Sequence, residues 1–258
     1  MSELFSIQLQ NRQQQGGDGV WLDLPTTTEQ VQAALRQIGI SSDNPQGLFI
    51  SGYFAEEEKR FAIPYNMVLA SNVDELNFLA ARLETLSAEE HAELNAALQA
   101  PQSELFSIGR ITDFPENVDY YVHLPDVRGS AQLGDYYLNR SGMVNMPDEW
   151  KGGIDTAQFG RYVAQQEQGA FTQYGYLVKS GDEWQKVHEG QPVPEEYRVL
   201  SFPVPEVMRD AANIPPPVQP ETEPQKVIPI ILNGKDSAER MKEITDRLET
   251  GIQQLFDS

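Results

Sequence analysis

Three histidines are the first residues that could carry acid–base or metal chemistry. His91, His123 and His188 fall on an expected helix, strand and loop, and none stands at a metal-ligand spacing from another histidine or a carboxylate. We therefore interpret them as structural or surface histidines. The 258 residues contain no cysteine, which excludes thiolate catalysis, disulfides and cysteine-based zinc sites.

Of two further functional motifs, one is absent and the other lacks required residues. There is no Gly-x-Ser-x-Gly motif that would expose a nucleophilic serine. The stretch 233–237 follows an expected strand and opens an expected helix, as a phosphate-binding loop does. Pro229 stands where that motif needs its first glycine, however, and Asp236 stands where it needs a serine or threonine. We therefore reject a phosphate site.

Carboxylates are abundant enough to suggest acid–base or metal sites, with clusters at Glu56–Glu58 and at Glu89, Glu90 and Glu93. A catalytic carboxylate needs burial or a specific charge partner to shift its pKa. We expect these residues in helix first turns and polar loops, where water keeps them ionised. The sequence therefore predicts a solvated acidic face, with no enzyme activity, no cofactor and no metal site.

The charge balance is the unusual property of the chain, because 39 Asp and Glu face 19 Lys and Arg, a net charge of −20. Nucleic acid and anionic membranes are poor partners for such a protein, whereas a basic surface such as the DNA channel of an enzyme would attract it. No basic leader and no long apolar run is present. We expect a soluble, cytoplasmic protein.

The size of the charge also matches a DNA footprint. Duplex DNA carries one phosphate charge per about 1.7 Å, so this charge corresponds to about 34 Å of helix, or about ten base pairs. The excess is concentrated early, with 18 acidic and 6 basic residues in 1–125 against 11 and 7 in 126–202. A mimic of DNA also needs its charges spread along an elongated body.

An internal repeat indicates how such a body is built. The hexapeptide SELFSI occurs at Ser2–Ile7 and again at Ser103–Ile108, and Trp21–Pro25 after the first copy is answered by Tyr121–Pro125 after the second. Each copy is rich in aromatic and β-branched residues, so each predicts a strand pair.

A helix and a third strand complete each expected unit. In the first, Val31, Ala34, Leu35 and Ile38 stand at helical spacing after a capping run at 26–28, and the closing strand is 47–53. In the second, the corresponding helical positions are Leu133, Tyr136, Tyr137 and Arg140, and the closing strand is 169–176. An insertion at 146–168 carries a further helix, for which Asp155 is the expected N-cap. Aromatic residues of these units are expected in the core, namely Trp21, Tyr53, Phe171 and Tyr176.

The expected class is α+β, an elongated multi-domain chain with two related ββαβ modules at 1–70 and 103–202. A helical domain at 71–102 separates them, with capping boxes at Ser71–Asp74 and Ser87–Glu90. A proline-rich linker follows at 203–225. The tail at 226–258 reads as a strand, Val227–Leu232, and an amphipathic helix whose apolar stripe is Met241, Ile244, Leu248, Ile252 and Leu255.

These features together resemble the ArdA antirestriction family, which is encoded on conjugative mobile elements. The resemblance runs over about residues 3–180 and rests on the order and spacing of several short motifs. They are 19–25, the helix around Glu29, 47–54, 74–77, 86–98, 135–138, Gly142, 146–147, 154–155, 159–161 and 175–176. The tail, especially 241–249, resembles the lead-in to the single-strand DNA-binding domain of ArdC-like proteins, so the chain is expected to be the front part of a longer protein.

The resemblance implies a homodimeric DNA mimic that occupies the DNA-binding groove of type I restriction-modification enzymes. It places an antirestriction motif in the stretch from Asp135 to Trp150, although Arg140 and Lys151 depart from the family's acidic character there. The motif residues that we select are Asp135, Tyr136, Tyr137, Asp148, Glu149 and Asp155. For the DNA-mimic face we select Glu56, Glu57, Glu58, Asp74, Glu75, Glu84, Glu89, Glu90, Glu93, Asp113, Glu116 and Asp119.

An alternative function stays open at this point. The acidic modules would also suit a binding module of a conjugation complex that docks on a basic relaxase or nucleoid protein without inhibiting restriction. The partners recovered in a pull-down would separate the two functions.

Overall fold

The first sheet is built from strands whose side chains alternate between core and solvent. The structure is a computed structural model that describes residues 4–14, 17–56 and 61–203. Strand β1 (Phe5–Asn11) lies between β2 (Val20–Leu24) and β3 (Leu48–Phe54), and both pairings are antiparallel. Every second side chain of β1, beginning with Phe5, is buried, as the period of two requires. The predicted strands of the first unit are confirmed.

Helix α1 (Thr28–Gln37) packs on this sheet through Val31 and Leu35, with the 3-10 turn η1 (Pro45–Gly47) leading on to β3. The Thr27 hydroxyl accepts a hydrogen bond from the backbone N–H of Gln30, and the Gln30 side chain accepts from the backbone N–H of Thr27. This capping box starts the helix within the predicted run at 26–28.

The two helices predicted within 71–102 are present as α3 (Val73–Leu83) and α4 (Ala88–Gln99). Two shorter helices that were not predicted flank them, α2 (Tyr65–Ala70) and α5 (Ile108–Thr112), and we call all four the middle helices. The capping box of α4 at Ser87–Glu90 is confirmed. The box predicted at Ser71–Asp74 is wrong by one residue, because Asn72 and Glu75 form it. The Ser71 hydroxyl instead donates to the carbonyl of Met67 in the preceding helix.

The second copy of the repeated hexapeptide is not a strand. In this copy the Ser107 hydroxyl accepts from the backbone N–H of Arg110 and caps α5, in which Ile108 and Ile111 are buried three residues apart. The first copy continues as QLQN and keeps a period of two, whereas the second continues as GRIT and takes the helical period. The flanking residues decide the conformation of an identical segment, and the predicted second ββαβ unit is therefore wrong.

The second sheet has its own topology. Strand β6 (Gly175–Lys179) lies between β4 (Tyr121–Leu124) and β5 (Ala170–Thr172), and both pairings are antiparallel. The single strand predicted at 169–176 is thus a hairpin, because the chain reverses at 173–174 and Gly175 adopts a φ of 134°. The short 3-10 turns η3 (Phe114–Glu116) and η4 (Val118–Tyr120) precede β4.

Helices connect β4 to this hairpin. They are α6 (Ser130–Asp135), the π-helical turn η5 (Tyr136–Arg140), α7 (Asp148–Lys151) and α8 (Thr156–Glu167). The predicted N-cap of α8 is confirmed, since the Asp155 carboxylate accepts from two backbone N–H groups. Helices α6 and α8 cross at two glycines. A Cβ on Gly134 would lie 1.9 Å from the carbonyl oxygen of Thr156, and one on Gly160 would lie 1.8 Å from that of Ser130.

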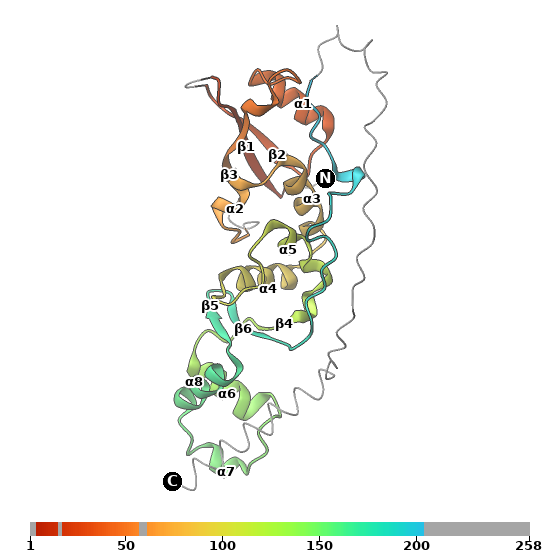
Figure 1. Cartoon of the computed structure of the whole chain (residues 1–258). Helices are drawn as coiled ribbons and strands as arrows, with labels where there is room; N and C mark the ends of the chain where they lie inside the picture. The colour runs from red at the N-terminus through yellow and green to blue at the C-terminus, as the bar shows by residue number, and fades with distance from the viewer. Residues whose placement is uncertain (1–3, 15–16, 57–60, 204–258) are drawn as a thin grey trace, which may run out of the picture.

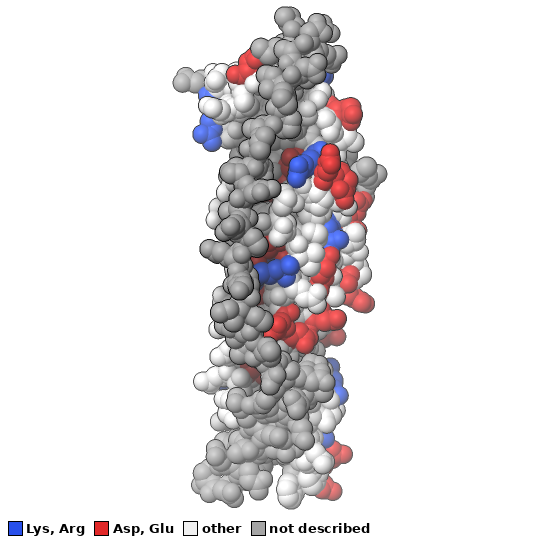
Figure 2. All heavy atoms as spheres, turned by 45° about the vertical axis from the view of Figure 1, so that its right-hand side comes forward, with Lys and Arg blue, Asp and Glu red and all other residues white. Residues whose placement is uncertain are grey.

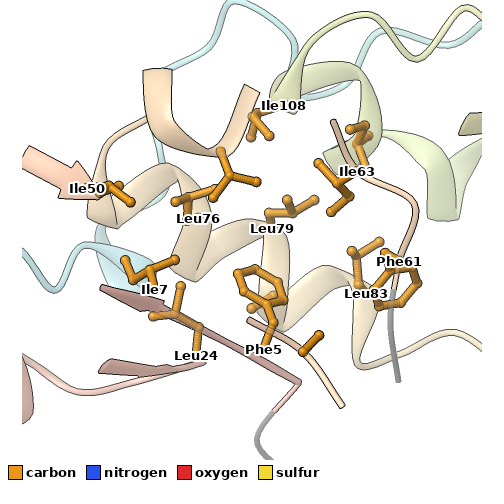
Figure 3. Packing of buried hydrophobic residues seen from close by; sticks show 14 of the residues in the cluster. Phe5, Ile7, Leu24, Ile50, Phe61, Ile63, Leu76, Leu79, Leu83 and Ile108 are labelled. Carbon is orange, nitrogen blue, oxygen red and sulfur yellow. The ribbon is translucent and has the colours of Figure 1, made fainter. Parts of the chain in front are cut away.

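Two hydrophobic cores result from this packing. The larger joins the first sheet, α1, the middle helices and one side of the second sheet. Figure 3 shows Phe5, Ile7 and Leu24 from the sheet facing Leu76 and Leu79 of α3. The smaller core lies between α6, α8 and Tyr176 of β6. The domain limits predicted at 70/71 and 102/103 remain a proposal.

The described body is elongated (Figure 1). The first sheet lies at one end, α3, α5 and α4 follow, and α6, α7 and α8 lie at the other end. Residues 181–203, which we call the return segment, run from the second sheet back along the middle helices to α1 and contain the 3-10 turn η6 (Glu195–Tyr197). The predicted linker beyond residue 203 and the tail at 226–258 lie outside the described residues.

Candidate partner-binding surface

Acidic side chains extend along the elongated body. Figure 2 shows Asp and Glu over much of the length of the visible face, with a smaller number of Lys and Arg among them. The selected acidic residues that are exposed are Glu56, Glu84, Glu89, Asp119, Asp148, Glu149 and Asp155. Glu57 and Glu58 lie outside the described residues. The selected set therefore contains exposed carboxylates and carboxylates that the fold itself uses, and Asp155 is both, because it also caps α8.

Helix α4 carries both kinds. Glu89 is exposed in its first turn, while the Glu90 carboxylate accepts a hydrogen bond of 2.7 Å from the backbone N–H of Ser87. Hydrogen bonds from the backbone and the hydroxyl of Ser87 hold the pKa of Glu90 below its usual value. This position thus keeps its charge near the helix N-terminus, where negative charge is favourable.

Glu93, one turn further along α4, differs from the expected solvated carboxylate. Burial raises the pKa of Glu93 to about 8, and the nearby carboxylates of Asp119 and Glu90 add to the shift. Its Oε1 atom is shielded from solvent and has no hydrogen-bond partner. At neutral pH this side chain is therefore largely protonated, which corrects the expectation that water keeps it ionised.

Two selected aspartates bind the return segment. The Asp74 carboxylate accepts hydrogen bonds of 2.7 and 2.6 Å from the backbone N–H groups of Val199 and Leu200. Asp113 is completely buried and accepts from the N–H groups of His188 and Glu189 at 2.6 and 3.2 Å. Asp113 therefore cannot lie on a face that a partner touches, and its selection is wrong. A buried carboxylate that satisfies two backbone donors has a structural function.

Two other selected residues also contact the protein itself. Glu75 closes the capping box of α3 with Asn72. Glu116 forms an ion pair with Arg82, and both side chains are only partly exposed. These carboxylates add to the charge of the middle helices, but their geometry is fixed by the fold.

The acidic residues of the expected antirestriction motif lie around α6, η5 and α7. The Asp135 carboxylate accepts from Arg140 at 2.6 Å, and hydrogen bonds from Asn139 and Arg140 lower the pKa of Asp135. Asp148 pairs with Lys151 at 2.8 Å, and that contact lowers the pKa of Asp148. Arg140 and Lys151, the two basic residues noted in this stretch, therefore each form an ion pair with an acidic residue of the same stretch.

The two tyrosines of this motif have different surroundings. Tyr136 is partly exposed, whereas Tyr137 is buried and its hydroxyl donates to Glu167. The Tyr176 hydroxyl donates to the second oxygen of the same carboxylate at 3.0 Å. Burial raises the pKa of Glu167, and it also raises the pKa values of both tyrosines. Sequence reasoning did not select Glu167, because nothing in its polar surroundings at 165–168 signals burial.

The histidines lie in ordinary structural contacts. The ring of His91 packs edge-on against Phe61 at 4.0 Å, and burial lowers the pKa of His91. His123 hydrogen-bonds the carbonyl of Tyr174 at 3.0 Å, and His188 packs against Phe78. Over residues 4–14, 17–56 and 61–203, no group of three or more His, Asp or Glu is arranged to hold a metal ion. Within the same ranges, none of the helices has the length and apolar character needed to cross a membrane.

Comparisons with known proteins complete the description of this surface. Among curated proteins, no sequence matches the chain. A family model described as "Antirestriction protein (ArdA)" matches residues 17–178, a range that runs from β2 into β6 and includes all the middle helices and the paired motif residues, while β1 lies before it. Because this match covers more than half of the 258 residues, the chain belongs to the ArdA antirestriction family.

Proposed function

We propose that this protein inhibits type I restriction-modification enzymes by occupying their DNA-binding groove as a mimic of duplex DNA. The observation that carries the proposal is the placement of exposed carboxylates along an elongated body. Glu56 follows β3 of the first sheet, Glu84 and Glu89 lie at the ends of α3 and α4, and Asp148 and Glu149 lie on α7. Figure 1 shows the first sheet, these helices and α7 in this order along the body.

This arrangement suits a groove lined by Lys and Arg. Ionised carboxylates take the positions of phosphates and release the anions that the basic groove holds, so binding weakens as salt rises. The same charge repels nucleic acid, and we propose that the acidic body does not bind DNA directly. Antirestriction in this mechanism needs no catalytic residue, because the inhibitor only excludes DNA from the enzyme.

Competition on a purified type I methyltransferase tests the proposal. The protein is titrated against a fluorescent DNA duplex, and displacement is measured at several salt concentrations. The variant Glu84→Gln/Glu89→Gln should displace DNA about threefold to tenfold less well, since each exposed ion pair contributes about 0.2–1 kcal/mol. Its affinity should also depend less steeply on salt.

A matched control removes the same charge elsewhere. Glu195 and Glu196 are exposed on η6 of the return segment, so Glu195→Gln/Glu196→Gln gives the same net charge as the test variant. We expect this control to retain most of its inhibition. Equal losses in the two variants would show that only the amount of charge matters, and a ternary complex with DNA still bound would contradict occupation of the groove.

We also propose a homodimer, for which the family resemblance is the support. Two copies would double the length of the charge track to about twenty base pairs on the phosphate spacing of DNA. Sedimentation equilibrium at micromolar concentration measures the mass directly, and a monomer at that concentration would contradict the dimer.

A further inference from the structure

The free edge of the first sheet carries a groove that no described residue fills. Strand β2 pairs with β1 on one side, and among the described residues it has no strand on the other. A groove of about 470 Å³ runs between this edge and α1. It is lined by successive β2 residues from Val20 to Asp23 and by one face of α1 that includes Gln30, Ala33 and Gln37.

The groove has the dimensions and chemistry of a site for an added strand. An edge strand offers unpaired backbone N–H and C=O groups, and an extended segment that pairs with them extends the sheet. Ala33 and Ala34 on α1 have short side chains, which leave room beside β2. Trp21, expected in the core, is 50% exposed on the outer side of this strand, so that expectation is wrong and an apolar surface is left uncovered.

We propose that the segment Val227–Leu232 of this chain occupies the groove as a fourth strand beside β2. The described chain ends on the other side of α1 from the groove, so the linker would pass around this helix. Leu200 and Phe202 lie with Leu48 and Phe49 of β3, the Ser201 hydroxyl accepts from Gln32 of α1 at 3.3 Å, and the carbonyl of Pro203 accepts from the backbone N–H of Ser42. The proposal is independent of the function proposed above.

The intervening chain is long enough to reach. Residues 204–226 span at most about 76 Å at about 3.3 Å per residue, while α1 with its ten residues is about 15 Å long. Tethering at this distance keeps the segment at a high effective concentration near the groove, which favours pairing within one chain.

The sequence of the segment fits an added edge strand. Val227–Leu232 is apolar at every position, which suits a strand that meets Trp21 on one face and the alanines of α1 on the other. Pro229 has no N–H to donate and is tolerated where its nitrogen faces away from β2, where it also blocks further pairing. Because the N–H groups of alternate residues point to the same side of a strand, those of residues 228, 230 and 232 would then face β2.

Charge agrees with the same placement. Asp18 is exposed just before β2, and Asp23 is exposed near its end. Lys226 and Lys235 flank the apolar segment on its two sides. Pairing would therefore bring lysines near the aspartates at both ends of the strand, where each contact contributes modestly.

Disulfide scanning in the full chain tests the proposal, since the protein has no cysteine of its own. Asp23→Cys is combined in turn with a single cysteine at each position from 227 to 232, and intramolecular disulfide is measured by mass spectrometry. We expect alternate positions to form disulfide about tenfold more than their neighbours, because side chains alternate between faces. In the control, Gln99→Cys at an exposed site on α4 takes the place of Asp23→Cys, and its disulfide yield measures random collision.

Hydrogen exchange in the unsubstituted chain provides an independent measurement. Amides in 227–232 should exchange at least about tenfold more slowly than those of an unpaired chain, and Ile230→Asp should remove this protection without changing β1. Equal disulfide yields at all six positions, disulfides only between two chains, or exchange of 227–232 at the unpaired rate would each overturn the proposal.

Discussion

Replacing Glu93 with glutamine should change the pH dependence of stability. The pKa of Glu93 is about 8 in the folded protein, against an ordinary value of 4.5, because of burial and the carboxylates of Asp119 and Glu90. The unfolded chain releases this proton above its own, lower pKa, while the folded chain still holds it. Stability is therefore fully present below pH 4.5 and is lost as pH rises through about 8.

The size of the effect follows from the same two values. A difference between 4.5 and about 8 corresponds to nearly 5 kcal/mol at about 1.36 kcal/mol per pKa unit. The side chain is only partly buried, so water screens the charge and we expect about 2 kcal/mol. Glutamine cannot ionise. The Glu93→Gln variant should accordingly lack this loss and be about 2 kcal/mol more stable than the unsubstituted protein at pH 9, relative to pH 5.

Urea unfolding at pH 5 and pH 9, followed by tryptophan fluorescence, measures the difference. Glu89→Gln is the matched control, because Glu89 is exposed on the same helix. The control should show the pH dependence of the unsubstituted protein. If Glu93→Gln and Glu89→Gln respond to pH identically, the carboxyl of Glu93 is ionised in the folded state and the reasoning fails. The same result would return Glu93 to the acidic face.

Three further substitutions test the packing. Asp113→Ala removes the acceptor of two backbone N–H groups and should lower the free energy of unfolding by about 2–4 kcal/mol in urea titration, while a loss below 1 kcal/mol would contradict its structural function. Gly134→Ala should destabilise by several kcal/mol in thermal unfolding because the Cβ would overlap a backbone carbonyl, whereas Gly129→Ala has open space and should be nearly neutral. Tyr176→Phe removes a donor to Glu167 and should cost about 1.5–3 kcal/mol in urea titration, and a neutral effect would show that the bond is not formed.

Local signals predicted the helices well. The caps at Thr27, Ser87 and Asp155 were located within one residue, because an N-cap side chain bonds the backbone only two or three positions away. The strands of the first sheet were predicted from alternation. The capping box predicted at Ser71 was wrong by one residue. Ser71 and Asn72 are both suitable N-cap residues, and sequence spacing alone does not decide between them.

Non-local choices were beyond the sequence. The hexapeptide at 103–108 matches a strand of the first sheet, yet its conformation is set by the helix that follows and by the packing of Ile108 and Ile111 in the larger core. The order β4-β6-β5 depends on contacts between residues about fifty positions apart. Glu93 reads as a surface residue from its position on α4, and the approach of Asp119 is visible only in three dimensions.

The return segment explains why some carboxylates of this acidic chain are structural. It has only one short 3-10 turn of regular structure, so many of its backbone N–H groups need acceptors outside the segment. Asp74 and Asp113 supply them, and the side chains of Asn77 and Asn117 bind its carbonyls at Tyr197 and Gln185.

A carboxylate in such a position holds the elongated body together as well as adding charge. A substitution that removes Asp74 or Asp113 would loosen the return segment and so weaken the proposed inhibition even if neither residue touched the target enzyme. Loss of activity at these positions is therefore no evidence for mimicry of DNA. Only the substitution of an exposed carboxylate that is not a structural acceptor for backbone N–H groups, such as Glu89, can separate the effect of charge from the effect of folding.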